Sequence, residues 1–184
     1  MKMNYKKSLK FITLLLASLL IATVSATVYY SLSMQTTITV GTTWVKFISA
    51  ADTPSESTIT DATCTLSLST LANSSLVYEK AVGLSNTYTG IRYIRLQHVS
   101  VSPNGTAPVS NFTHVKFYLL DNSLTVQASL NYTTSGDNWS VTSTTDWKAI
   151  PASTTWYIKV ETFSPAGATA GTQCTIEIAV DVQQ

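Results

Sequence analysis

The feature that most constrains this fold is a strict alternation of side chains between residues 27 and 40. Polar side chains separate most of the apolar positions, and the spacing of two is broken only at Thr36. A period of two is typical of a β-strand that buries one face. Because no hairpin partner lies next to it in the sequence, this strand must fill a groove in its own domain or in a neighbouring molecule. Its apolar positions are Val28, Tyr30, Leu32, Met34, Ile38 and Val40.

The segment before this strand has the three parts of a secretory signal peptide. Four lysines and no acid lie in the first ten residues, residues 11–24 are almost all apolar, and Val24-Ser25-Ala26 offers slim side chains to a signal peptidase. The apolar run is shorter than the roughly 20 residues that span a bilayer. We therefore expect residues 1–26 to be a cleaved signal peptide and the protein to be secreted.

The alternative is a retained N-terminal helix, either a membrane anchor or the assembly helix of a type IV pilin. Against it, β-branched residues are frequent at 23–28 and two tyrosines follow. These residue types favour a strand over the second half of a helix.

Composition limits the classes of partner. Cleavage after residue 26 removes four of the 11 basic residues and none of the 10 acidic ones, so the remaining 158 residues carry a formal charge of −3. That length suits one domain with its own core. The charge argues against a nucleic-acid partner, because phosphate binding needs clustered lysine and arginine. Charged residues make up only 11% of the chain, and serine and threonine are abundant instead.

Nearly all of the remaining chain has the pattern of short strands separated by turns. Turn residues stand at 121–123 and 135–138. Many short strands without a convincing helix predict an all-β fold, here a single jelly-roll-like β-sandwich over residues 39–184, preceded by the N-terminal strand at 27–38. The expected strands cover residues 44–48, 62–68, 76–82, 91–101, 115–120, 124–130, 139–141, 156–161 and 173–182.

The last strand, residues 173–182, has the most regular alternation. We expect it to lie centrally in a sheet, with Glu177 and Asp181 facing solvent.

Two cysteines, Cys64 and Cys174, lie on the apolar positions of their strands. In a secreted protein, two inward-facing cysteines predict a disulfide. Closing a loop of about 110 residues would stabilise the fold by about 4–5 kcal/mol. The alternative is a pair of buried free thiols that pack as small apolar side chains.

Catalytic and metal-binding patterns are scarce. His98 and His114 fall on different expected elements, each more typical of a sheet rim than of a general base. The sequence has no G-x-S-x-G elbow, glycine-rich phosphate loop, HExxH motif or CxxC pair. Glu161 and Glu177 could face each other as glycosidase carboxylates do, although strand acids that face solvent are commoner. We therefore expect no enzyme, cofactor, metal or small-molecule substrate.

Five segments match the N-x-[ST] acceptor sequence for N-glycosylation. Most fall in expected turns or strand ends, which suggests a glycosylated surface. The alternative is that these residues are ordinary turn asparagines. The acceptor residues are Asn73, Asn104, Asn111, Asn131 and Asn138.

The chain resembles the archaeal bundling pilins, which are similar to the bacterial TasA-type biofilm matrix fibre proteins. The resemblance rests on the signal-like segment, on residues 27–34 and 62–68, and on the closing pattern at 164–167 and 174–180. It implies donor-strand complementation, in which the N-terminal strand of one subunit fills a groove in the next. The chain is poorer in lysine and aspartate than the bacterial members.

On this resemblance, the side chains that fill the groove would be Val28, Tyr30, Leu32 and Met34. The partner would be the same protein, in a homopolymer at the cell surface, and fibres could also bundle laterally. Strand addition of this kind satisfies main-chain hydrogen bonds, and alternate side chains occupy pockets.

Two other functions fit the same sequence. The strand could pair within its own sandwich, giving a monomeric secreted surface domain that binds a sugar or the cell envelope. The chain could also be a type IV-like pilin that keeps residues 11–32 as a helix.

Overall fold

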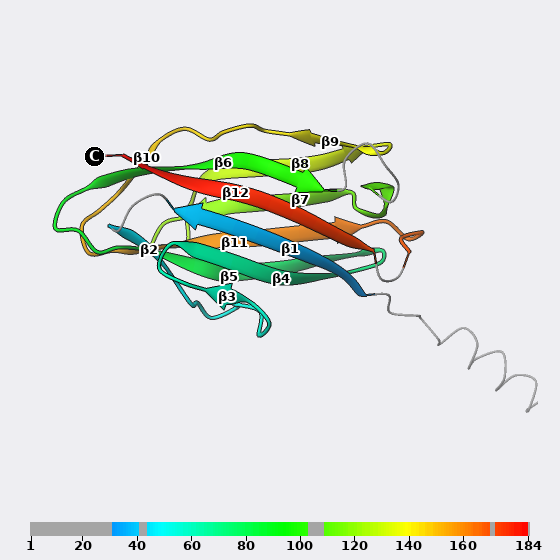
Figure 1. The fold of residues 1–184 in the computed structure, drawn as a ribbon, viewed down its shortest axis with the longest axis horizontal. Coiled ribbons are helices and arrows are strands. Elements are labelled where there is room, and N and C mark those ends of the chain that lie inside the picture. The colour runs from blue at the N-terminus through cyan, green and yellow to red at the C-terminus, as the bar shows by residue number, and fades with distance from the viewer. Residues whose placement is uncertain (1–30, 41–43, 103–108, 170–171, 184) are drawn as a thin grey trace, which may run out of the picture.

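The computed structural model describes residues 31–40, 44–102, 109–169 and 172–183. The expected signal peptide, residues 1–26, and the two groove-filling residues Val28 and Tyr30 lie outside this range. The described residues form an all-β sandwich of two six-stranded sheets, as Figure 1 shows. The all-β sandwich expected from the alternation is therefore confirmed.

The strand order is β10-β6-β12-β1-β4-β3 in the first sheet and β2-β5-β11-β7-β8-β9 in the second sheet. A short 3-10 helix, η1 (Val109–Asn111), precedes β7. The strands are β1 (Ser31–Val40), β2 (Val45–Ile48), β3 (Thr58–Ile59), β4 (Thr63–Leu71), β5 (Ser74–Asn86), β6 (Arg92–Ser102), β7 (His114–Leu120), β8 (Val126–Ser135), β9 (Asn138–Val141), β10 (Lys148–Ile150), β11 (Thr155–Ser164) and β12 (Gln173–Gln183).

The core lies between the two sheets and follows from the alternation along each strand. In β11, and in β12 as far as Val180, every second side chain is buried and the intervening ones face outward. Aliphatic side chains fill the centre, and an aromatic cluster fills one end, where Tyr132 packs edge-on against both Phe117 and Trp139. Interdigitated apolar side chains of this kind supply most of the stability of a sandwich.

The prediction for the last strand is correct. β12 lies inside the first sheet, between β6 and β1. Glu177 accepts a hydrogen bond from Ser100 Oγ (2.7 Å) and Asp181 from Arg95 Nε (2.8 Å), both on the outer face.

Both predicted turns are also present. Between β7 and β8, the Asp121 side chain accepts hydrogen bonds from the backbone N–H groups of Ser123 (2.8 Å) and Thr125 (2.9 Å). Between β8 and β9, Gly136 has a φ of 61°. Glycine adopts this left-handed conformation without the strain that a Cβ would add.

The strands run between two ends of the sandwich. β1 and β12 run side by side in one direction, from right to left in Figure 1. We call the end where β1 begins, near Ser31, Leu71 and Gln173, the Ser31 end. The opposite end, where β1 stops and β2 begins, is the Val40 end. Residues 31 and 32 are part of β1, so this portion of the alternative N-terminal helix is a strand instead.

Candidate functional site: the groove that holds the first strand

The strand β1 lies in a groove between β12 and β4. It pairs with β12 in parallel, from Ser33 opposite Gln173 to Val40 opposite Val180. On its other edge it pairs with β4 in the antiparallel sense. Both partners are remote in the sequence, and neither forms a hairpin with β1. In the single chain, therefore, β1 fills a groove of its own domain.

The side chains of β1 that face inward are the ones that the alternation predicted. Met34, Thr36, Ile38 and Val40 are all buried, whereas Gln35 and the other outward residues are partly or fully exposed. Leu32 belongs to β1. The expected boundary between a donor strand and the sandwich, at residues 38 and 39, falls within β1, which continues to Val40.

The described ladders show which residues occupy the groove. They begin at Ser31 opposite Leu71 and at Ser33 opposite Gln173, where β4 ends and β12 starts. In the part of the chain that the structure describes, the groove therefore holds residues 31–40. Of the four groove-filling residues expected from the resemblance, Met34 is the one whose side chain the structure describes in the groove.

The other strands show why a gap exists at this position. Three antiparallel pairs nest one inside the next along the chain, and each is directly hydrogen-bonded: β5 with β11, β6 with β10, and β7 with β8. The fourth and outermost pair would be β4 with β12. These two strands also run antiparallel to each other, but β1 lies between them. β1 therefore occupies a gap in an otherwise complete nested arrangement.

Burial makes β1 a substantial part of the core. Met34 and Ile38 are each at most 1% exposed and Val40 is 6% exposed. Burying such an apolar side chain contributes about 1.5–3 kcal/mol, before the entropy of ordering the strand is subtracted. Losing β1 would expose the groove and divide the first sheet into β10-β6-β12 and β4-β3.

One buried polar side chain in β1 lacks a hydrogen-bond partner. Thr36 is fully buried, and its hydroxyl has no hydrogen-bond partner. A buried polar group without a partner costs about 1–3 kcal/mol. The residue that interrupts the apolar spacing in the sequence is therefore also a weak point of the strand in its groove.

The disulfide expected between Cys64 and Cys174 is absent, and both residues are buried free thiols. Cys64 lies opposite Ile38 on one edge of β1, whereas Cys174 lies opposite Met34 on the other edge. Two strand spacings and a stagger of four residues put their Cα atoms about 16 Å apart, compared with the limit of about 7 Å for a disulfide. The alternation placed both side chains inward correctly, but it carried no information on the intervening strand.

Burial raises the pKa of both thiols to about 12. Each therefore stays a neutral thiol near pH 7 and contributes packing. Neutral thiols are poor nucleophiles and poor metal ligands.

His98 does not lie on the rim as its sequence context suggested. It keeps the inward parity of Ile94 and Leu96 and pairs with Ile178, and the bulge in β6 follows it at Val99. Its Nδ1 lies 3.0 Å from the hydroxyl of Tyr132 in the opposite sheet. Burial raises the pKa of Tyr132, and the nearby Cys174 adds to the shift. This contact links the two sheets.

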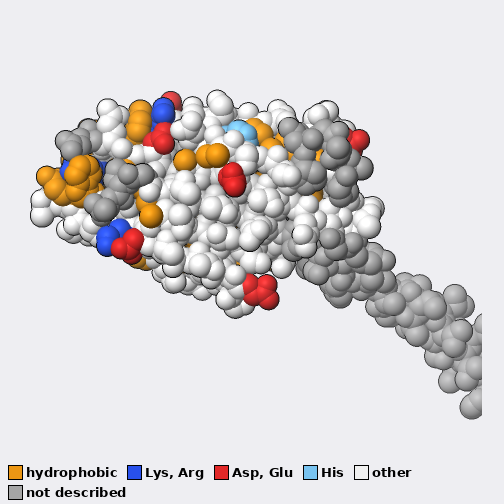
Figure 2. Space-filling model, viewed as in Figure 1, with side chains coloured by type: hydrophobic (Ala, Val, Ile, Leu, Met, Phe, Trp, Pro, Cys, Tyr) orange, Lys and Arg blue, Asp and Glu red, His pale blue; other side chains and the backbone are white. Residues whose placement is uncertain are grey.

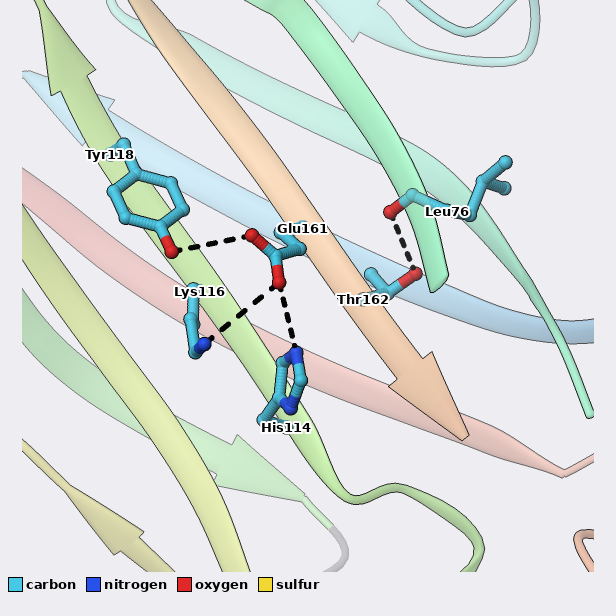
Figure 3. Close-up of polar contacts among 6 residues, drawn as sticks. All are labelled: Leu76, His114, Lys116, Tyr118, Glu161 and Thr162. Atoms are coloured by element: carbon cyan, nitrogen blue, oxygen red, sulfur yellow. Dashed lines mark hydrogen bonds and ion pairs between the residues drawn. The ribbon is translucent and has the colours of Figure 1, made fainter. Parts of the chain in front are cut away.

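A charged cluster lies on the outer face of the second sheet (Figure 3). Glu161 of β11 contacts three donors of β7: His114 Nε2 at 3.2 Å, Lys116 Nζ at 3.8 Å and the Tyr118 hydroxyl at 3.3 Å. The ring of His114 also stacks on Phe163, with centroids 5.7 Å apart. The carboxylate is held by its neighbours on a flat sheet face, an arrangement that stabilises strand pairing.

Burial, followed by the charge of Glu161 and the hydrogen bond to it, raises the pKa of Tyr118. Glu161 lies on the outer face of β11 and Glu177 on the outer face of β12, so the sandwich separates the two carboxylates that could have formed a glycosidase pair. Within the described ranges, no group of three or more histidine, cysteine, aspartate or glutamate residues could hold a metal ion.

A pocket of about 280 Å³ lies near the start of β1. Its lining is mainly polar, and the only charged side chain among the lining residues is that of Glu56. The remaining lining residues are Met34, Gln35, Ser67, Gln173, Cys174 and Thr175.

The glycosylation candidates differ in accessibility. Asn73, in the turn between β4 and β5, and Asn138, at the start of β9, are both exposed at the Ser31 end. Asn131 is half-buried in β8, and its Oδ1 is buried without a partner. Asn104 lies outside the described residues.

Asn111 is poorly placed to accept a glycan. It is only 7% exposed, its Nδ2 donates to Thr172 Oγ1 (3.0 Å), and its Oδ1 accepts from the backbone N–H of Thr169 (2.9 Å). The side chain ties η1 to the loop before β12. Modification would break both hydrogen bonds, so this placement argues against Asn111 as an acceptor in the folded domain.

Hydrophobic side chains gather at the Val40 end, at the left of Figure 2, while most of the visible face is neither charged nor apolar. The guanidinium of Arg92 lies over the rings of both Tyr88 (3.6 Å to the centroid) and Trp44 (4.4 Å). Its Nε is buried without a hydrogen-bond partner. Tyr88, Ile91 and Tyr93 are exposed beside it.

No protein-family model matches the chain, and no curated protein matches it. In the part of the chain that the structure describes, no helix is long and apolar enough to cross a membrane.

Proposed function

We propose that this protein is the structural subunit of an extracellular fibre that assembles when β1 of one molecule enters the groove between β4 and β12 of another. In this proposal, the partner is a second copy of the chain, no cofactor or substrate is needed, and the signal-like segment directs secretion.

The strand order supports a jelly-roll-like core with one inserted strand. Without β1, β2, β3 and β9, the orders are β4-β12-β6-β10 and β5-β11-β7-β8. Nested pairs of this kind, with the first strand beside the last, are the arrangement of an eight-stranded jelly roll. β1 is then an addition to the core.

The observation that carries the proposal is that β1 fills a gap between strands to which it has no local connection. Both of its edges are paired, its inward face is buried, and its direct link to the rest of the domain runs through residues 41–43. A strand of this kind can leave and be replaced by an identical strand without rearranging any other hairpin. Strand addition between copies then extends the sheet from one molecule to the next.

The energetics also allow exchange. A strand from a neighbour can bury the same inward side chains that the chain's own β1 buries, so exchange conserves most of the interaction energy. The balance between the two states then depends on protein concentration, on strain in the link and on new contacts at the junction. Exchange without closure generates a filament.

A truncated protein tests this proposal. Purified protein that lacks residues 1–40 should form no fibres under the electron microscope, whereas protein that lacks only residues 1–26 should form them. A synthetic peptide of residues 31–40 should bind the truncated chain and raise its melting temperature. The matched control is a peptide with Ile38→Asp, which should not bind. Fibres that persist without β1 would rule out the proposal.

A monomeric secreted β-sandwich is the second candidate, and the pairing of β1 within its own chain favours it. It predicts that protein lacking residues 1–26 stays monomeric at every concentration in analytical ultracentrifugation. A sugar or cell-envelope ligand would then have to be sought separately.

A further inference from the structure

The link between β1 and β2 starts and finishes at the same end of the sandwich. At the Val40 end, the backbone N–H of Val40 donates to the carbonyl of Ala62 (2.8 Å), and that of Phe47 donates to the carbonyl of the adjacent Asp61 (3.1 Å). Residues 41–43 connect the two strands, so the Cα atoms of Val40 and Trp44 can never be more than about 14 Å apart. β1 itself is about 33 Å long.

These lengths constrain any exchange of β1. If β1 swings out, Val40 stays near the Val40 end of its own body and Ser31 points away from it. The end of the acceptor's groove that receives Val40 must therefore lie against the donor's Val40 end. The direction of the strand in the groove decides which end that is.

Insertion in the direction seen in the single chain places the donor's Val40 at the acceptor's Val40 end. The two Val40 ends then face each other. The acceptor's own β1 leaves its body at this same junction and lies beside the donor's empty groove. Reciprocal exchange closes a two-fold dimer, with no free strand or groove to continue growth.

Insertion in the opposite direction places the donor's Val40 at the acceptor's Ser31 end. The acceptor's own Val40 end, from which its β1 leaves, is then at the far side of the acceptor. Each copy can receive one strand at its Ser31 end and donate one from its Val40 end. The chain of copies remains open.

We propose that β1 enters the neighbouring subunit of the fibre in the reverse direction, antiparallel to β12 and parallel to β4. This inference rests on the proposed fibre function and specifies its interface. In the single chain, by contrast, β1 is parallel to β12 and antiparallel to β4.

The groove can accept either direction at similar cost. Because β4 and β12 run antiparallel to each other, a strand between them always forms one parallel and one antiparallel ladder. Reversal makes the ladder with β4 parallel and the ladder with β12 antiparallel, so the groove still contains one ladder of each kind.

The side chains of β1 also tolerate reversal. Turning the strand about an axis normal to the sheet leaves the same side chains inward. If Thr37 stays at the centre, Met34 and Val40 exchange places, as do Thr36 and Ile38. These four inward side chains are of similar size, so the part of the groove from Met34 to Val40 is filled in both directions. The outward residues Gln35, Thr37 and Thr39 are all polar and uncharged.

Cysteine cross-linking between two variants tests the direction. Gln35 lies opposite Thr175 in the single chain, whereas reversal about Thr37 brings it opposite Ala179, the present partner of Thr39. All of these side chains face outward. Protein lacking residues 1–26 and carrying Gln35→Cys is mixed with protein that lacks the same residues and carries either Thr175→Cys or Ala179→Cys. The two are denatured together under reducing conditions and reassembled, and the reductant is removed for oxidation only after assembly.

We expect fibres in which the mixture with Ala179→Cys gives disulfide-linked dimers on a non-reducing gel, and the mixture with Thr175→Cys does not. Each variant alone, and the wild-type chain with its buried Cys64 and Cys174, are controls that should remain unlinked. Fibres cross-linked through Thr175→Cys would overturn the reversed direction but would still agree with the proposed fibre function.

A second readout does not depend on register. In an electron cryomicroscopy map of the fibre, β1 should run antiparallel to β12 of the neighbouring subunit, and a parallel β1 would overturn the inference. Closed dimers without fibres, linked through Thr175→Cys, would instead reject the proposed fibre and the reversed strand together.

Discussion

Cys64 and Cys174 lie on opposite edges of β1, four residues apart along it, so a single strand separates the two thiols of the domain. This relationship ties their chemistry to the occupancy of the groove. While β1 is present, both side chains are buried. When β1 leaves, both face the open groove.

Thiol labelling should therefore report on β1. In the folded protein, a maleimide should modify Cys64 and Cys174 only after addition of denaturant. In protein lacking residues 1–40, both should react without denaturant, and a peptide of residues 31–40 should restore protection. Thr39→Cys, at an exposed position of β1, is the control that should react at once. Rapid labelling of the intact domain would contradict the arrangement.

Stability should fall at alkaline pH because of these thiols. In the unfolded chain they ionise near their ordinary pKa of 9.0, whereas burial holds the folded pKa of each at about 12. The unfolded state therefore loses protons first, and the free energy of unfolding decreases as pH rises from about 9 to 12. Urea denaturation at a series of pH values checks this. The double variant Cys64→Ala, Cys174→Ala should show a shallower decrease, and an unchanged slope would contradict the assignment.

Thr36→Val should stabilise the domain. The substitution replaces a buried hydroxyl that has no partner with a methyl group of similar shape, so we expect the free energy of unfolding to rise by about 1 kcal/mol. Urea denaturation measures the change. Thr39→Val, at an exposed position of the same strand, should change stability by less than about 0.5 kcal/mol. A destabilised Thr36→Val protein would show that the hydroxyl has a partner in solution.

Glu161→Gln should lower the pKa of Tyr118. The charge of Glu161 and its hydrogen bond both raise this pKa, but burial is the largest cause, so the value should move only part of the way to its ordinary value. Ultraviolet difference titration, with Tyr118→Phe as the reference, measures the shift. Glu177→Gln, on the outer face of the other sheet, should leave the titration unchanged, and an equal effect of both variants would contradict the cluster.

Local sequence patterns predicted much of the secondary structure. The spacing of two along residues 173–182 identified a central strand, and the acid, asparagine and glycine residues at 121–123 and 135–138 identified turns. These features depend on neighbouring residues alone, so a single sequence contains them. The parity of β1 was predicted for the same reason, and burial of Met34 agrees with it.

The missed features all depend on which strands are neighbours. Alternation put Cys64 and Cys174 in the core, but nothing in their own segments shows that β1 separates them. His98 continues the inward parity of Ile94 and Leu96, but its contact with Tyr132 comes from the opposite sheet, which its own segment does not show. Asn111 has an acceptor motif in the sequence, yet its partners Thr169 and Thr172 lie far along the chain.

The predicted start of the functional strand, Thr27, lies outside the described residues. Within them, the ladder with β4 begins at Ser31 and the ladder with β12 begins at Ser33. The strands that line a groove determine its length, so the sequence of the strand that fills the groove does not reveal that length.

The parallel ladder between β1 and β12 also has a consequence for the order of folding. β1 is the first described strand to be synthesised, and β12 is the last. Pairing across such a separation closes a very long loop, and contacts of this kind form slowly. β1 therefore cannot complete its ladders until the end of its own chain has been synthesised. Under the proposed fibre function, a finished neighbour already has both strands of the groove, so β1 could pair there first.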